Sequence, residues 1–161
     1  MDHTRTLEQI ADWHRWFAVE CNNAAWDLIG AEHRTPPDDQ RMLDLAHAAA
    51  FHWGQVGTPL NRARADVALA RAHALAGDAG LALAYAQQSV DYFEHNPCEE
   101  WDTVFAHGAL AHAAAAAGDH ERHAAHYARA HALAGRIDEA EDRAIVDADL
   151  ARLPQPEGWP A

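Results

Sequence analysis

Alanine dominates this sequence and limits what the chain can fold into. Of the 161 residues, 39 are Ala, against 9 Gly and 7 Pro. Alanine has the highest helix propensity of the amino acids, whereas Gly and Pro interrupt helices. The composition therefore predicts an all-α fold and excludes an all-β one. The length favours one domain or one compact array of repeats.

Glycine, proline and capping residues divide the chain into seven expected helices. We expect one helical-repeat domain over residues 1–153 and a frayed tail over residues 154–161. The helices run from about Thr6 to Ile29, from a cap at Asp38 or Asp39 to Gly57, from Leu60 to Gly77, from Asp78 to Asn96, from Glu99 to Ala117, from Asp119 to Ala134 and from Ile137 to Leu153.

A short pattern occurs twice at an offset of 41 residues: Ala68-Leu69-Ala70 before Gly77-Asp78, and Ala109-Leu110-Ala111 before Gly118-Asp119. Each copy predicts a helix, a Gly-Asp turn and a second helix. The pattern resembles the tetratricopeptide (TPR) repeat, because it has the Leu-Ala pair, the turn glycine and, at Ala82, the small residue of the second helix. The period is longer than the family's 34 or so residues.

The resemblance implies a TPR-like stack of antiparallel helix pairs with a capping C-terminal helix. It also implies a concave face that binds a peptide segment or a partner protein. In this register Arg64, Arg71, Phe105 and His112 would line that face, and the two arginines could clamp a carboxylate.

The balance of charges limits the partners. The net charge of -13 arises from 25 Asp and Glu against 12 Arg, with no Lys, and would repel a nucleic acid. The sequence shows no leader and no apolar run that could span a membrane, so we expect a cytoplasmic protein that binds neither nucleic acid nor membrane. Cys21 and Cys98 are expected to be free thiols. A homodimer formed by exposed helix faces stays open.

A metal site is the alternative interpretation. His47 and His52 lie five residues apart, so their side chains diverge by about 140° around a helix and cannot bind one ion together. Asp66 and His107 take the place of the large aromatic residue of the TPR pattern and need polar partners. Zinc, iron or copper could then be bound between helices by His47 or His52 with Asp66 and His107.

Other signals of function are weak. The sequence contains no GxSxG, P-loop, GxGxxG or HExxH motif, and whether the protein is an enzyme stays open. Titration of the 13 histidines could make it a pH sensor. The four histidines between residues 120 and 131 are expected to form a solvated face. The large aromatic residues are expected to supply much of the core: Trp13, Trp16, Phe17, Trp26, Phe51, Trp53, Phe93, Trp101 and Phe105.

Overall fold

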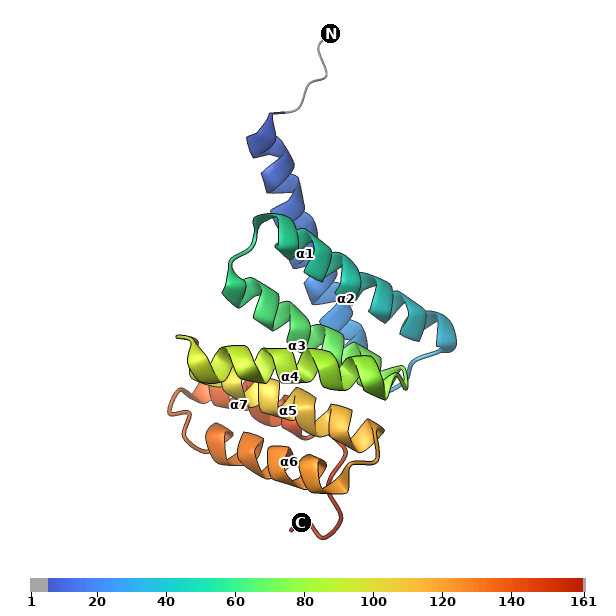
Figure 1. Cartoon of the computed structure of the whole chain (residues 1–161), viewed down its shortest axis with the longest axis vertical. Helices are drawn as coiled ribbons and strands as arrows, with labels where there is room; N and C mark the ends of the chain where they lie inside the picture. Colours follow the sequence, from blue (N-terminus) through green and yellow to red (C-terminus); the bar gives the residue numbers. More distant parts are fainter. Residues whose placement is uncertain (1–5, 161) are drawn as a thin grey trace.

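The computed structural model describes residues 6–160 and contains seven helices over that range, which confirms the predicted all-α fold (Figure 1). The seventh helix is shorter than expected at both ends. None of the helices in this range is long and apolar enough to cross a membrane. The helices are α1 (Leu7–Ile29), α2 (Pro36–Val56), α3 (Pro59–Leu75), α4 (Ala79–His95), α5 (Glu100–Ala116), α6 (His120–Ala134) and α7 (Ala140–Leu150).

The helices form a stack of pairs. The helix pairs α1–α2, α3–α4 and α5–α6 each pack together, and the first helices of successive pairs also touch, α1 with α3 and α3 with α5. Helix α7 continues this row by packing on α5 and α6. One face of the stack is therefore built from α1, α3, α5 and α7.

The first three helices begin at threonines. The Thr6, Thr35 and Thr58 side chains each accept a hydrogen bond from the backbone N–H three residues on, and the side chain at that position bonds back to the threonine N–H. Such capping boxes satisfy backbone donors that a helix leaves open at its start. The expected cap of the second helix at Asp38 or Asp39 was wrong, because Pro36 fits the first helical position and Asp38 completes the box from the third.

Both Gly-Asp turns have the same geometry. Gly77 and Gly118 have φ values of 84° and 71°, in the left-handed region that glycine adopts without strain. The N–H of the following aspartate reaches back to the carbonyl of the helix before it at 2.9 Å in both turns, and its carboxylate caps the next helix. Two residues thus end one helix and begin the next.

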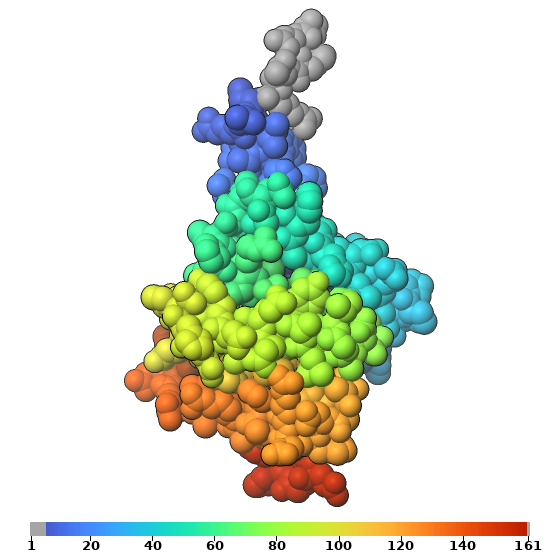
Figure 2. All heavy atoms as spheres, viewed as in Figure 1, coloured from blue at the N-terminus to red at the C-terminus, as the bar shows by residue number. Residues whose placement is uncertain are grey.

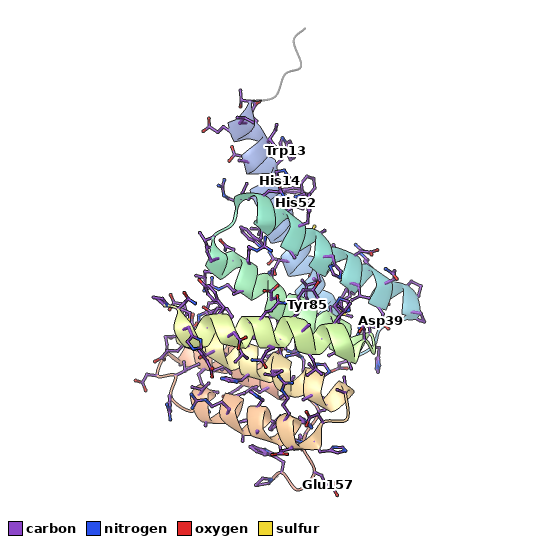
Figure 3. The ribbon with its side chains drawn as sticks, in the orientation of Figure 1. Trp13, His14, Asp39, His52, Tyr85 and Glu157 are labelled. Carbon is purple, nitrogen blue, oxygen red and sulfur yellow. The ribbon has the colours of Figure 1, made fainter. Side chains whose placement is uncertain are left out.

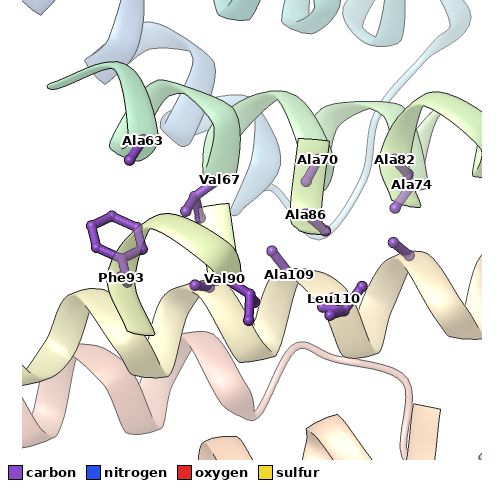
Figure 4. Close-up of a cluster of buried hydrophobic side chains, with 12 residues drawn as sticks. Ala63, Val67, Ala70, Ala74, Ala82, Ala86, Val90, Phe93, Ala109 and Leu110 are labelled. Atoms are coloured by element: carbon purple, nitrogen blue, oxygen red, sulfur yellow. The ribbon is translucent and has the colours of Figure 1, made fainter. Parts of the chain in front are cut away.

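The core consists mainly of alanine and aliphatic side chains (Figure 4). Between α3, α4 and α5, small residues such as Ala70, Ala86 and Ala109 are fully buried, which allows the helices to approach closely. The expectation of an aromatic core was wrong, because Phe93 alone of the nine aromatic residues is buried. Trp13, Trp16, Phe17 and Phe51 are exposed, and the other four are half-buried.

The C-terminal segment packs on α6. Leu153 and Pro156 are buried, His123 Nε2 donates to the Pro154 carbonyl at 2.9 Å, and the Trp159 ring lies 4.7 Å from that of Tyr127. The frayed tail expected here is therefore not found over residues 154–160, and Ala161 lies outside the described residues. The expected solvated histidine face was also wrong for His123, which this segment covers.

The turn geometry makes a prediction about alanine substitutions. Gly77→Ala and Gly118→Ala should each lower the free energy of unfolding by about 1 kcal/mol, because a Cβ atom is strained at positive φ. Gly135→Ala is the matched control, since Gly135 follows α6 with a φ of -61° and should tolerate alanine. Urea unfolding measures the free energy of unfolding of all three variants. Equal effects at the three positions would contradict this account of the turns.

Candidate functional site: an aromatic pocket

A pocket of about 520 Å³ opens on the face built from α1, α3, α5 and α7. Its walls come from all four of these helices, from Trp53 near the end of α2 and from Arg152 just after α7. Pockets that bind small ligands or anchor side chains fall in this range of volume. We refer to this recess as the aromatic pocket.

Four of the half-buried aromatic side chains line the aromatic pocket: Trp26, Trp53, Trp101 and Phe105. Trp101 and Phe105 lie one helical turn apart on α5, and their ring centroids are 6.2 Å apart. Trp26 of α1 packs edge-on against Phe105 at 5.6 Å. The rings of α1 and α5 therefore form one continuous wall.

Three of the four charged side chains in the pocket lining form ion pairs, and the fourth, Arg152, donates to the Ala148 carbonyl at 3.2 Å. Arg64 Nε and Nη2 donate to the two Asp102 carboxylate oxygens at 2.8 and 2.9 Å, and the Arg64 guanidinium lies 4.5 Å from the centre of the Trp101 ring. The hydrogen bonds to Asp102 raise the pKa of Arg64 further above its usual value. Asp102 also accepts from the Glu99 N–H at 3.1 Å at the start of α5, which fixes the carboxylate in place.

A second ion pair lies next to the pocket and joins α3 to α7. Arg71 Nη1 donates to Asp149 Oδ2 at 2.6 Å; Asp149 lines the pocket, whereas Arg71 is only 2% exposed. Arg71 Nε has no hydrogen-bond partner among residues 6–160. His112 is buried close by, and burial together with the Arg71 charge lowers its pKa to about 3.

The four residues predicted to bind a ligand therefore divide into two groups. Arg64 and Phe105 line the aromatic pocket, while Arg71 and His112 are buried outside its lining. Both guanidinium groups already face a carboxylate, so they could clamp a ligand anion only by giving up that partner.

Polar residues that the sequence reasoning missed complete the lining. Asn22 and Asn23 of α1 and Asn61 of α3 also line the pocket, and the Asn61 amide oxygen accepts from the Thr58 N–H in the capping box of α3. Within the described part of the chain, the Asn22 and Asn23 side chains make no hydrogen bond to the protein. The spacing of Val19, Asn22, Asn23 and Trp26 places them on one side of a helix and could have indicated this face.

The residues of the alternative metal site lie in separate contacts. His47 Nε2 lies 3.0 Å from His73 Nε2, and His52 Nδ1 lies 2.7 Å from His14 Nδ1. His107 Nδ1 lies 2.9 Å from His126 Nδ1 of α6. Over residues 6–160, no group of three or more His, Cys, Asp or Glu side chains is placed to hold a metal ion.

Burial is the main cause of the pKa shifts of His107 and Asp66, two of the candidate metal ligands. The partner of His107 is His126 of α6, and Glu94 of α4 lies 3.5 Å from its other ring nitrogen. Burial, with a smaller effect of His126, lowers the pKa of His107 to about 4. Burial raises the pKa of Asp66 to about 6, against a smaller opposing effect of Arg62. Burial therefore shifts the protonation equilibria of both groups toward the neutral form, and at pH 7 His107 is neutral while Asp66 is mainly ionised.

Comparison with known proteins gives no match: no family model fits the sequence, and no curated protein or solved structure is significantly similar to it. The residues and the geometry of the site are therefore the basis for inferring a function.

The buried histidines predict how stability depends on pH. His107 and His112 titrate near 6.5 in the unfolded chain and at about 4 and 3 in the folded protein, so the unfolded state takes up protons first as the pH falls. On acidification from pH 7 to pH 5, each of these two histidines should lower the free energy of unfolding by about 2 kcal/mol. Asp66 has the opposite effect and should raise the free energy of unfolding by about 1 kcal/mol over the same pH range, because its pKa is higher in the folded protein than in the unfolded chain.

Urea unfolding of wild-type protein and two variants at pH 7 and pH 5 separates these effects. His112→Leu should reduce the loss of stability on acidification, and Asp66→Asn should increase it. The account of the buried histidines fails if His112→Leu shows the same pH dependence as wild type.

Proposed function

We propose that this protein is a small helical-stack binding module that recognises a peptide segment of a partner protein in its aromatic pocket. The observation that carries the proposal is the position of Trp26, Trp53, Trp101 and Phe105, whose rings line a pocket instead of filling the core. Exposed and half-exposed aromatic rings are the side chains that most often anchor a binding partner.

The size and polarity of the aromatic pocket favour one apolar side chain and the backbone around it. A volume of about 520 Å³ accommodates a large side chain and part of the adjacent backbone. The rings supply apolar contact, and the carboxamides of Asn22 and Asn23 offer both donors and acceptors. A peptide bond has the same two kinds of group, so these amides match a neutral backbone well.

The charges of the pocket favour a neutral ligand over a phosphate. The lining balances two arginines, Arg64 and Arg152, with two aspartates, Asp102 and Asp149, so its formal net charge is zero. Arg64 is paired with Asp102, and Arg152 donates to the Ala148 carbonyl at 3.2 Å. The net charge of -13 adds a long-range repulsion of polyanions. A peptide segment with an apolar anchor fits this balance better than a nucleotide does.

Selection of ligands from a random peptide library, followed by affinity measurement, tests the proposal. Trp53→Ala removes a ring from the pocket wall, and Asn23→Trp fills the pocket from an exposed position. Each should weaken selected peptides by about tenfold or more. Leu81→Trp introduces the same indole at an exposed position of α4 outside the pocket and should leave the affinity unchanged.

Two results would contradict the proposal. One is a library from which no peptide binds more tightly than about 1 mM. The other is a set of selected peptides whose affinities are the same for wild type, Trp53→Ala and Asn23→Trp.

A further inference from the structure

A second group of aromatic residues gathers at the free end of the stack, away from the aromatic pocket. The first turns of α1 project from the rest of the molecule (Figures 1 and 2). Trp13, His14 and His52 lie close together at this end (Figure 3). We define the α1 apolar face as the large exposed side chains of this region: Leu7, Ile10, Trp13, Trp16 and Phe17 of α1 with Phe51 of α2.

The α1 apolar face is continuous. The Trp16 and Phe17 rings lie 4.9 Å apart, Phe17 stacks on His52 at 5.3 Å, and His52 lies 5.3 Å from Phe51. Phe51 in turn contacts His14 at 6.2 Å. These contacts connect α1 to α2 along one side of the helical hairpin, so the rings form one surface.

The exposure of this face is high for a monomeric protein. Trp16 is 52% exposed, Phe51 59% and Leu7 86%. Because an aromatic side chain offers about 150–250 Å² of surface, the face presents roughly 700 Å² per molecule. Monomers rarely leave a continuous apolar patch of this size in contact with water, and patches of this kind mark association sites.

We propose that this face joins two copies of the chain in a two-fold symmetric homodimer. A standard protein interface buries about 800 Å² per partner, so two such faces supply the area that a stable dimer needs. A two-fold axis brings the same patch of each copy together, and two hairpins meeting in this way form a four-helix arrangement.

The charge and shape of the face also suit a second copy. Within residues 7–17 the charged side chains are Glu8, Asp12 and Arg15; Asp12 and Arg15 neutralise each other at 3.0 Å, so one net negative charge remains on each copy. Two copies can therefore approach here with little of the repulsion expected from a net charge of -13. A shallow hollow beside Trp13 and Trp16 gives a projecting ring of the second copy a place to enter.

Sedimentation velocity of the full chain from about 1 to about 100 µM tests the proposal. Wild type should be dimeric at the upper concentration. The double variant Trp16→Ser/Phe51→Ser should raise the dissociation constant by about 100-fold or more, because it removes two large rings from the interface. Both residues are exposed, so the fold should be kept, which circular dichroism checks. Leu81→Ser, at a 43% exposed leucine of α4, should dimerise like wild type.

Wild type that stays monomeric at about 100 µM overturns the proposal. So does a dimer whose dissociation constant is the same in Trp16→Ser/Phe51→Ser as in wild type. Pocket-binding peptides should bind the double variant with wild-type affinity, since the two rings lie outside the aromatic pocket.

Discussion

Close packing of helices through alanine is the constraint on which the rest of this structure depends. Ala70, Ala82, Ala86 and Ala109 are fully buried between α3, α4 and α5, and their methyl groups let the helix backbones approach closely. A core of this kind has little space for indole or phenyl rings, since overpacking a close-packed interior costs about 1–3 kcal/mol. The larger rings are therefore found mostly at the surface.

The surface rings are not scattered. One group lines the pocket between α1, α3, α5 and α7, and the other covers the projecting end of the α1–α2 hairpin. The ion pairs Arg64–Asp102 and Arg71–Asp149 join α3 to α5 and to α7, and so fix the helices that carry the pocket walls. Burying Arg71 has an energetic cost that the ion pair with Asp149 opposes, and removing Asp149 would leave the buried guanidinium charge uncompensated.

The sequence predicted the helices well because helix signals are local. Threonine caps, proline at the first helical position and the two Gly-Asp turns each act within a few residues. The cap of α2 was assigned to Asp38 or Asp39 because the capping role of Thr35 before two prolines was overlooked. The shorter seventh helix follows from Glu139, which caps it after Asp138, so that residues 137–139 remain outside.

The site was predicted only in part. Arg64 and Phe105, which were expected on one face, both line the aromatic pocket, but Trp53 and Trp101 were expected in the core and Asn22 and Asn23 were overlooked. Which faces of α1, α3, α5 and α7 meet depends on contacts between residues far apart in the chain, as in the pair of Arg71 and Asp149. Periodicity within one helix does not contain that information, and alanine faces on several sides of a helix make it harder to infer.

The central claim is that an alanine core leaves the tryptophans free to form binding surfaces, with those of the aromatic pocket reserved for a ligand. The six indole N–H signals in a nitrogen–proton correlation spectrum test it most directly. Addition of a peptide selected from the library should shift the signals of Trp26, Trp53 and Trp101 and leave those of Trp13, Trp16 and Trp159 unchanged. Shifts confined to the second group, or no shift in any indole signal at saturation, would contradict the claim.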